Sequence, residues 1–178
     1  DLRRTKDANT FFVSHYFFSF NDVKYLIFYY NPIHFWDKLL IEKVNDKINA
    51  IVKVNENVLK EAKKLDDNYE KYKDKKLFGL AVTIKDSIDT KGIVTTGGTK
   101  GRKNYVPKED ASVVKKLKEE GAIILGKTNT PELTLEYETN NKIYGKTNNP
   151  LDLSKSPGGS SGGAAAAVAT GCSAFDIG

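Results

Sequence analysis

The chain contains the stretch Ser156-Pro157-Gly158-Gly159-Ser160-Ser161-Gly162-Gly163, and the alanine-rich segment AAAAVATG follows it at 164–171. Four glycines and three serines occur in the first eight of these residues. Glycine lets the backbone approach other backbone closely and adopt conformations that other residues avoid. Alanine is the best helix former and has a small side chain. The pattern predicts a tight loop bearing serine hydroxyls that leads into a helix thin enough to lie inside a protein.

Other interpretations of the same loop are open when it is considered alone. A run of glycine and serine can be a flexible linker, although linkers are not normally followed by a helix of buried type. The loop can also hold a phosphate group at the helix N-terminus, or it can be a close-packed turn without chemistry. A partner residue elsewhere in the sequence has to decide among these.

The composition is that of a soluble globular protein: 178 residues, 39% hydrophobic and 29% charged. The net charge of +5 is mild, and the lysines alternate with acids, as in the stretch 115–120. Such mixing is typical of a solvated helix surface, so we expect no nucleic-acid partner. Methionine is absent, the chain opens on Asp1, and Gly178 falls within an expected strand. We therefore expect truncation at both ends.

The residues available for catalysis are limited. Cys172 is the single cysteine and cannot form an internal disulfide, which suits a reducing compartment, so we expect a cytoplasmic location. His15 and His34 are the two histidines, and no cysteine–histidine cluster has the spacing of a metal site. Histidine-based acid–base chemistry and a bound metal are therefore not expected.

Residues 1–36 differ in composition from the rest and form a separate segment. Twelve of the nineteen aromatic residues lie there. Polar residues interrupt the apolar run, so it contains no span of about 20 apolar residues that could cross a bilayer. Since Tyr and Trp favour membrane interfaces, membrane association is an alternative, without further support. We assign no function to this segment.

From residue 37 onward the sequence alternates between helix and strand patterns. Helices are predicted at about 37–48, 55–65, 111–120 and 131–137, and strands at 49–54, 77–84 and 122–125. Asn55 and Asp110 are the expected caps of the second and third helices, with Leu59 and Val113 on their buried faces. Strand, helix and strand in succession over 77–125 predict a parallel α/β arrangement with the helix as crossover.

The stretch GAIILGKT at 121–128 matches the phosphate-loop pattern G-x-x-x-x-G-K-[ST]. That motif requires a strand before the first glycine and a helix after the Lys-Thr pair. Here the variable positions are themselves the predicted strand, and Pro131 follows shortly afterwards. We therefore expect no nucleotide binding by this stretch.

Lys85 is the upstream partner that the serine loop needs. It ends the apolar run Ala81–Ile84, so its amine would emerge from a buried strand. A lysine at a strand end usually reaches solvent. A desolvated lysine instead has a lowered pKa and becomes a base near neutral pH. Lysine paired with serine is a known way to activate a serine nucleophile.

With these residues together, the chain resembles the amidase signature hydrolases. The resemblance covers about 37–178 and rests on ordered blocks at 79–86 (GLAVTIKD), 95–98 (TTGG), 126–132 (GKTNTPE), 145–150 (GKTNNP) and 156–163. It implies that 37–178 is the N-terminal part of an amidase signature domain. The implied fold is α/β/α, with a mixed, partly parallel sheet covered by helices, in truncated form.

The resemblance also implies a Ser–cisSer–Lys triad. In it, Lys85 is the catalytic lysine and Ser160 is the bridging serine, preceded by a cis peptide bond. The nucleophilic serine would lie a few residues beyond Gly178, outside this chain. The residues implied to support the loop or contact substrate are Gly158, Gly159, Ser161 and Gly162.

The activity implied is hydrolysis of a small-molecule amide through an acyl-enzyme, with no metal or organic cofactor. The block at 130–134 resembles amidases of free amides, including relatives of fatty acid amide hydrolase. The glutaminase component of a glutamyl-tRNA amidotransferase, its A subunit, is the alternative. A catalytically inactive fragment with a structural or binding role is a further one. The oligomeric state is not predicted.

Overall fold

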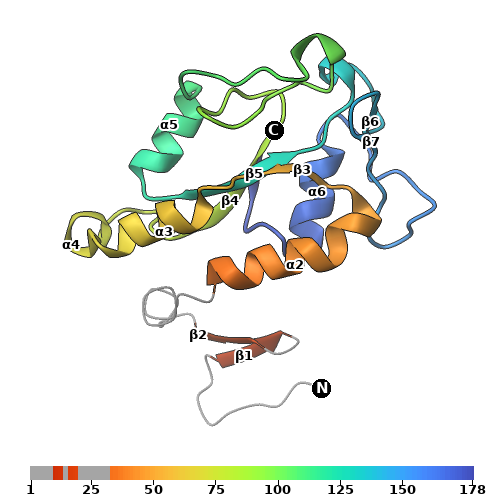
Figure 1. Cartoon of the computed structure of the whole chain (residues 1–178). Coiled ribbons are helices and arrows are strands. Elements are labelled where there is room, and N and C mark those ends of the chain that lie inside the picture. Colours follow the sequence, from red (N-terminus) through yellow and green to blue (C-terminus); the bar gives the residue numbers. More distant parts are fainter. Residues whose placement is uncertain (1–9, 14–15, 20–32) are drawn as a thin grey trace. The chain divides into compact units, whose positions relative to one another are not determined.

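The computed structural model describes residues 10–13, 16–19 and 33–178, and the chain divides into two units, Asp1–Ile33 and His34–Gly178 (Figure 1). In the first unit, β1 (Thr10–Val13) and β2 (Tyr16–Ser19) pair antiparallel, with Phe11 opposite Phe18. Our expectations for the remainder of the aromatic segment fall outside the described residues. None of the helices in the described part of the chain combines the length and apolarity that crossing a membrane requires.

The second unit alternates between helices and strands. Its elements are α2 (Ile33–Ile48), β3 (Ile51–Val54), α3 (Val58–Asp66), α4 (Tyr69–Tyr72), β4 (Ala81–Lys85), η1 (Lys100–Arg102), α5 (Ser112–Glu119), β5 (Ile123–Thr128), η2 (Glu132–Thr134), β6 (Asn140–Asn141), β7 (Gly145–Lys146), α6 (Gly162–Ala169) and β8 (Asp176–Ile177). Here η denotes a 3-10 helix.

The central sheet has the strand order β3-β5-β4-β8. The β4 strand runs parallel to both β5 and β8, while β3 is antiparallel to β5. The α5 helix connects β4 to the parallel strand β5, which confirms the crossover predicted over 77–125. The mixed, partly parallel α/β fold expected from the sequence is therefore confirmed.

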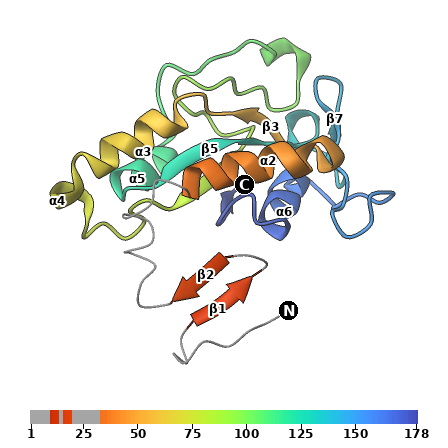
Figure 2. The ribbon, with the colours of Figure 1, turned by 60° about the horizontal axis from the view of Figure 1, so that its bottom comes forward.

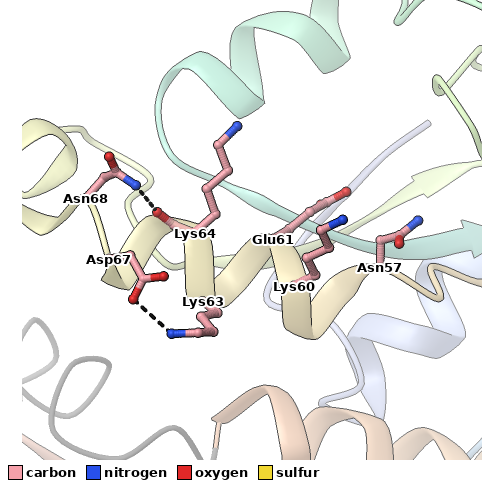
Figure 3. A pocket seen from close by; sticks show the side chains of 7 residues that line it. All are labelled: Asn57, Lys60, Glu61, Lys63, Lys64, Asp67 and Asn68. Atoms are coloured by element: carbon pink, nitrogen blue, oxygen red, sulfur yellow. Dashed lines mark hydrogen bonds and ion pairs between the residues drawn. The ribbon is translucent and has the colours of Figure 1, made fainter.

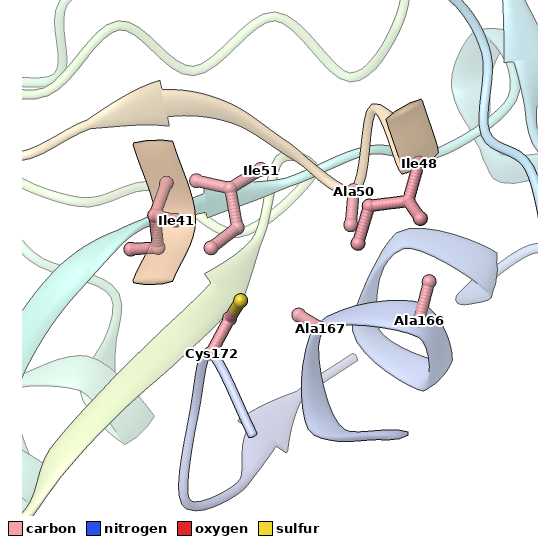
Figure 4. Packing of buried hydrophobic residues seen from close by; sticks show 7 residues of the cluster. All are labelled: Ile41, Ile48, Ala50, Ile51, Ala166, Ala167 and Cys172. Carbon is pink, nitrogen blue, oxygen red and sulfur yellow. The ribbon is translucent and has the colours of Figure 1, made fainter. Parts of the chain in front are cut away.

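Helices pack on both faces of this sheet, because successive side chains of a strand point to opposite faces (Figures 1 and 2). On one face, Val82 and Ile84 of β4 meet Val114 and Leu117 of α5. On the other face, β3 packs against α2 and α6. Figure 4 shows this second cluster: Ile41, Ile48, Ala50, Ile51, Ala166, Ala167 and Cys172.

The α6 helix lies against the sheet because its side chains are so small. Five of its eight residues are buried, and all five are glycine or alanine. A Cβ atom at Gly163 would lie 2.3 Å from the backbone nitrogen of Asn129 and 2.8 Å from the carbonyl oxygen of Ala50. No residue with a side chain fits there without moving the backbone, which explains the glycine before the alanine run.

Several details expected from the sequence are wrong. Asp110 does not cap α5; its carboxylate accepts hydrogen bonds from the Lys91 backbone and the Lys118 amine. Leu59 and Val113 are exposed, because the buried stripes of their helices run through neighbouring positions instead.

The helix predicted at 131–137 is also wrong. The structure has only the 3-10 turn η2 there, because Leu133 and Thr134 adopt left-handed backbone conformations with φ of 53° and 62°. Such conformations end a regular helix.

The caps and strand ends differ by a few residues. The second helix begins at Val58, and Asn55 instead accepts a hydrogen bond from the Asn57 backbone through its side chain. The strand predicted from Asn49 begins at Ile51, since Asn49 has a φ of 49°.

The phosphate-loop-like stretch lies in the sheet. Of its four variable positions, 123–125 lie in β5 as predicted, whereas Ala122 precedes the strand; the strand also continues beyond the prediction, through Gly126 and the Lys-Thr pair. The Lys127 side chain is fully buried, and its amine donates to the Ile88 carbonyl and to the Thr90 hydroxyl. The backbone amides of β5 are committed to strand pairing, and the lysine that would contact a phosphate is anchored to a neighbouring loop instead.

Candidate active site

Lys85 is the last residue of β4, and its side chain lies on the sheet face covered by α6. The side chain is buried, with the residue 6% exposed. Its amine donates to the Ser160 hydroxyl at 2.7 Å and to the Ser161 hydroxyl at 2.8 Å. The structure therefore brings together the lysine and the two serines predicted from the sequence.

The environment of Lys85 favours its neutral form. Burial lowers the pKa of the amine, because removing it from water disfavours the charged ammonium, while the Asp176 carboxylate acts in the opposite direction. The net result is a pKa below that of an ordinary lysine. A neutral amine held against a hydroxyl is able to accept its proton.

The loop that presents Ser160 has an unusual backbone. The peptide bond between Gly159 and Ser160 is cis, and Gly158 has a φ of +91°, a conformation that suits glycine. A Cβ atom at Gly159 would come within 2.8 Å of the Glu136 carbonyl oxygen and the Tyr137 carbonyl carbon. The two glycines are thus needed for the backbone conformation and for close packing.

A family model for amidases, described simply as "Amidase", matches residues 39–178. The chain belongs to the amidase family. Its relatives include the A subunit of the glutamyl-tRNA(Gln) amidotransferase of Thermoanaerobacter pseudethanolicus, which is 46% identical over 139 residues, or 78% of this chain. The chain spans 28% of the length of that relative.

Solved structures of the amidase family share the fold. The A subunit of the glutamyl-tRNA(Gln) amidotransferase from Thermotoga maritima has a TM-score of 0.72 and 35% identity; the match covers 83% of this chain and 30% of that one. A 6-aminohexanoate cyclic dimer hydrolase complexed with substrate has a TM-score of 0.71 and 30% identity; the match covers 81% and 29%. Both an amide hydrolase and a component of an amidotransferase therefore resemble this chain.

In this member of the amidase family, Thr139 holds the serine loop from both sides. Its hydroxyl donates to the Gly158 carbonyl at 2.9 Å and accepts from the Gly162 amide at 2.9 Å. Gly162 is buried, and a Cβ atom there would lie 2.3 Å from the Thr139 hydroxyl oxygen. Thr130 adds a hydrogen bond to the Ser160 carbonyl at 3.0 Å. Sequence reasoning gave no role to Thr139, because nothing in its local pattern marks it.

A buried amide network supports the same loop from below. The Asn141 side chain donates to the Asn129 side-chain oxygen and to the Thr130 carbonyl, both at 2.7 Å. Asn129 in turn donates to the Thr147 hydroxyl at 2.9 Å. These residues lie in the blocks 126–132 and 145–150 or between them, so the resemblance located the region but not the contacts.

The segment after Lys85 is fixed by the neighbouring residue. Asp86 is fully buried, and its carboxylate accepts hydrogen bonds from the backbone amide and the hydroxyl of Thr96. Burial raises the pKa of Asp86, and its hydrogen bonds and the charge of Lys127 act in the opposite direction. This anchoring orients the strand end from which the Lys85 side chain projects.

Gly178 lies directly beside the site. A Cβ atom there would be 2.9 Å from Cδ of Lys85 and 3.1 Å from the Ser161 hydroxyl oxygen. The pairing of β8 with β4 produces this approach, because Ile177 lies opposite Ile84 and the next register position is that of Lys85. Beside the end of β4 and the serine loop before α6, the backbone that leaves β8 is therefore the third segment that lies at the site.

The pocket drawn in Figure 3 is separate from this site. It has a volume of about 630 Å³, and Asn57, Lys60, Glu61, Lys63, Lys64, Asp67 and Asn68 line it. These residues belong to α3 and its ends, and Lys63 and Asp67 form an ion pair of 3.0 Å.

Proposed function

We propose that Lys85 and Ser160 form the proton-relay half of a Ser–cisSer–Lys site that hydrolyses an amide bond. The observation that carries this proposal is the buried Lys85 amine at 2.7 Å from the Ser160 hydroxyl, next to a cis peptide bond. Membership of the amidase family supports it. Gly158, Gly159 and Gly162 allow the loop its shape, and Ser161 holds the amine from the second side.

The reaction that we propose uses a nucleophilic serine from outside these 178 residues. That serine attacks the amide carbonyl carbon while its proton passes to Ser160 and the Ser160 proton passes to neutral Lys85. The proton then returns through Ser160 to the leaving nitrogen, the C–N bond breaks, and an acyl-enzyme remains. Water attacks the ester and releases the acid, with the same relay accepting and returning its proton.

The segment that follows β8 in a longer protein is the one that we expect to carry this nucleophilic serine. Gly178 packs against the Lys85 side chain and the Ser161 hydroxyl, so the chain that continues from it in a longer protein begins at the site. The curated relatives that this chain matches are more than three times as long as the matched part, which spans 28% of the Thermoanaerobacter protein. Their remaining length offers room for a third catalytic residue.

The complete protein that includes this sequence provides the test. Release of ammonia from a simple amide and from glutamine is measured for the unaltered protein and for Lys85→Met and Ser160→Ala. We expect each variant to lose on the order of 10²- to 10⁴-fold in kcat/KM, the usual contribution of a general base. The matched control is Lys142→Met, which removes an exposed lysine in the loop between β6 and β7. Full activity of Lys85→Met would contradict the proposal.

The A subunit of a glutamyl-tRNA amidotransferase is the second candidate, favoured by the 46% identity to the Thermoanaerobacter protein of that name. The block at 130–134 instead favours amidases of free amides. In the amidotransferase role, the amide is glutamine and the protein acts with partner subunits. A kcat/KM for glutamine well above that for simple aliphatic or aromatic amides would select this candidate, and the reverse order would select a free-amide hydrolase.

We also propose a cytoplasmic location. Cys172 is the single cysteine of the sequence and is buried in the cluster formed by α2, β3 and α6; because one cysteine cannot form an internal disulfide, the sequence suits a reducing compartment. Cell fractionation followed by immunodetection tests this, and recovery in the membrane fraction would instead favour the membrane-associated alternative raised by the aromatic residues of 1–36.

A further inference from the structure

Asp176 has a buried carboxylate oxygen with no hydrogen-bond partner. One oxygen, Oδ2, accepts a hydrogen bond from the Thr128 hydroxyl at 3.0 Å. The other, Oδ1, is inaccessible to water and unpaired, and it is the one such side-chain atom found among the described residues. A buried polar atom without a partner is rare in native structures and calls for a physical reason.

The strand pairing places this carboxylate at the base of the Lys85 side chain. Asp176 lies opposite Thr83, two residues before Lys85 and on the same face of the sheet, so it is a diagonal neighbour of the lysine. Thr128 lies opposite Lys85 on the other side of β4. Because β4 runs between β5 and β8, the hydrogen bond from Thr128 to Asp176 crosses over β4 beside the lysine stem.

The charged groups around this carboxylate are few. From β4 it faces Lys85, and from β5 the buried Lys127 acts on it, while the Thr83 hydroxyl beside it donates to Ser173. Burial raises the pKa of Asp176, whereas the neighbouring Thr83 and Thr128 hydroxyls and the charges of Lys127 and Lys85 favour the ionised form. Within the described part of the chain, Asp176 is the charged group that acts on the Lys85 amine, since Asp86 on the adjoining position interacts with Lys127 instead.

We propose that Asp176 is a positioning residue for Lys85: its carboxylate lies on the same face of the sheet as the Lys85 side chain and stabilises the ammonium that the relay forms. This inference rests on the proposed function, in which Lys85 is the base. When the relay delivers its proton, the Lys85 amine becomes an ammonium in a site largely closed to water. The Asp176 charge stabilises that ammonium, so proton transfer to Lys85 costs less than it would beside a neutral residue.

Nuclear magnetic resonance of the full chain measures the effect directly. The 13Cε shift of Lys85, assigned by its loss in Lys85→Met, is titrated with pH in the unaltered chain and in Asp176→Asn and Asp176→Glu. Asn keeps the size and the acceptor for Thr128 but removes the charge, so we expect the Lys85 pKa to fall. Glu keeps the charge, so we expect it to hold the Lys85 pKa above that of the Asn variant. Glu109→Gln, which neutralises an exposed acid, is the control and should leave it unchanged.

An unchanged Lys85 pKa in Asp176→Asn would overturn the proposal, as would an equal fall in Glu109→Gln. Coupling between two sites is reciprocal, so Lys85→Met must also raise the Asp176 pKa, followed through its 13Cγ shift. This second measurement decides the matter if Asp176→Asn does not fold, because no rise would refute the coupling. In the complete protein, Asp176→Asn should also move the rising limb of the plot of kcat/KM against pH, where Lys85 loses its proton, to lower pH.

These outcomes separate the two proposals. If Lys85→Met retains full hydrolytic activity, the proposed function fails whether or not Asp176 shifts the Lys85 pKa. If Lys85→Met is inactive and Asp176→Asn leaves the Lys85 pKa unmoved, the function stands and the role of Asp176 fails.

Discussion

The Lys85 amine nitrogen lies 2.7 Å from the Ser160 hydroxyl oxygen, although the two residues are 75 positions apart in the sequence. The contact joins the end of a central strand to a loop at the start of α6, so it exists only when the sheet and that helix are packed together. At this distance a proton passes between the two groups without movement of the backbone. If this contact is the proton relay, the hydroxyls of Ser160 and Ser161 should contribute unequally to the rate, and the rate should depend on pH through Lys85.

Ser160 and Ser161 contact the same amine but should differ in effect. In the complete protein, Ser160→Ala removes the relay hydroxyl, and we expect kcat/KM to fall on the order of 10²-fold or more. Ser161→Ala removes one hydrogen bond to the amine, and we expect a smaller loss of about 5-fold, because a hydrogen bond contributes about 1 kcal/mol. Steady-state kinetics on one amide substrate measures both. A larger loss in Ser161→Ala would assign the relay to Ser161.

The rate of hydrolysis should rise with pH through the pKa of Lys85. The neutral amine is the base, and burial lowers its pKa, so the active form is present at a lower pH than for an ordinary lysine. A kcat/KM profile between about pH 5 and 10 should therefore show a rising limb whose midpoint lies clearly below the usual lysine value of about 10.4. A limb at that usual value would mean that the amine is not desolvated in the working protein.

Lys127 should make folding stability rise as the solution becomes alkaline. Burial lowers its pKa to about 8, despite the nearby Asp86 charge. Between about pH 8 and the ordinary lysine pKa of about 10.4, the unfolded chain keeps this proton and the folded chain releases it. The free-energy cost of burying the ammonium, about 3 kcal/mol at most, therefore disappears as the pH rises through this range.

Urea unfolding from about pH 7 to 10.5 on the unaltered chain and on Lys127→Met checks this. The Met variant lacks the titrating group, so the unaltered chain should gain free energy of unfolding relative to it as pH rises. A constant difference between the two would show that Lys127 titrates normally. Exposed Lys142→Met provides the control, since its difference should not vary with pH.

Gly163→Ala should destabilise the fold even though alanine favours helices. Its Cβ atom would lie 2.3 Å from the Asn129 backbone nitrogen, and the resulting overpacking costs about 1–3 kcal/mol, more than the gain in helix propensity of about 1 kcal/mol. Gly101→Ala is the matched control, because its Cβ atom would meet nothing within 4 Å. Thermal unfolding should show a clear loss for the first and little change for the second; equal behaviour would contradict the close approach.

The sequence alone predicted those elements whose local pattern of residues determines their structure directly. The apolar run before Lys85 predicted β4, the succession of strand, helix and strand predicted the parallel crossover, and the glycine–alanine composition predicted a buried helix at α6. Each depends on residue size or on periodicity, which tertiary contacts reinforce here. The family resemblance, based on several ordered blocks, predicted the fold class.

Other features depend on contacts between distant segments, which no local pattern reports. Leu133 and Thr134 take left-handed conformations while the Leu133 amide binds the Gly97 carbonyl, so a sequence that suits a helix forms a turn. Thr139 and Asp176 reach the site only through the fold, the first from the segment before β6 and the second from β8. Their importance is visible only when the sheet order is known.

The smallness of α6 sets an unusual rule for how this region can vary. In a typical surface helix, the sequence is constrained by which positions are apolar and which are charged. In α6, the buried positions are limited by side-chain volume instead. This limit on volume applies to the buried Ala166 and Ala167. It does not apply to the exposed residues, which are Ala165, Val168 and Ala169. Among related sequences, the buried positions of this helix should therefore exchange only glycine, alanine and residues of similar size, whereas the exposed positions should accept larger side chains.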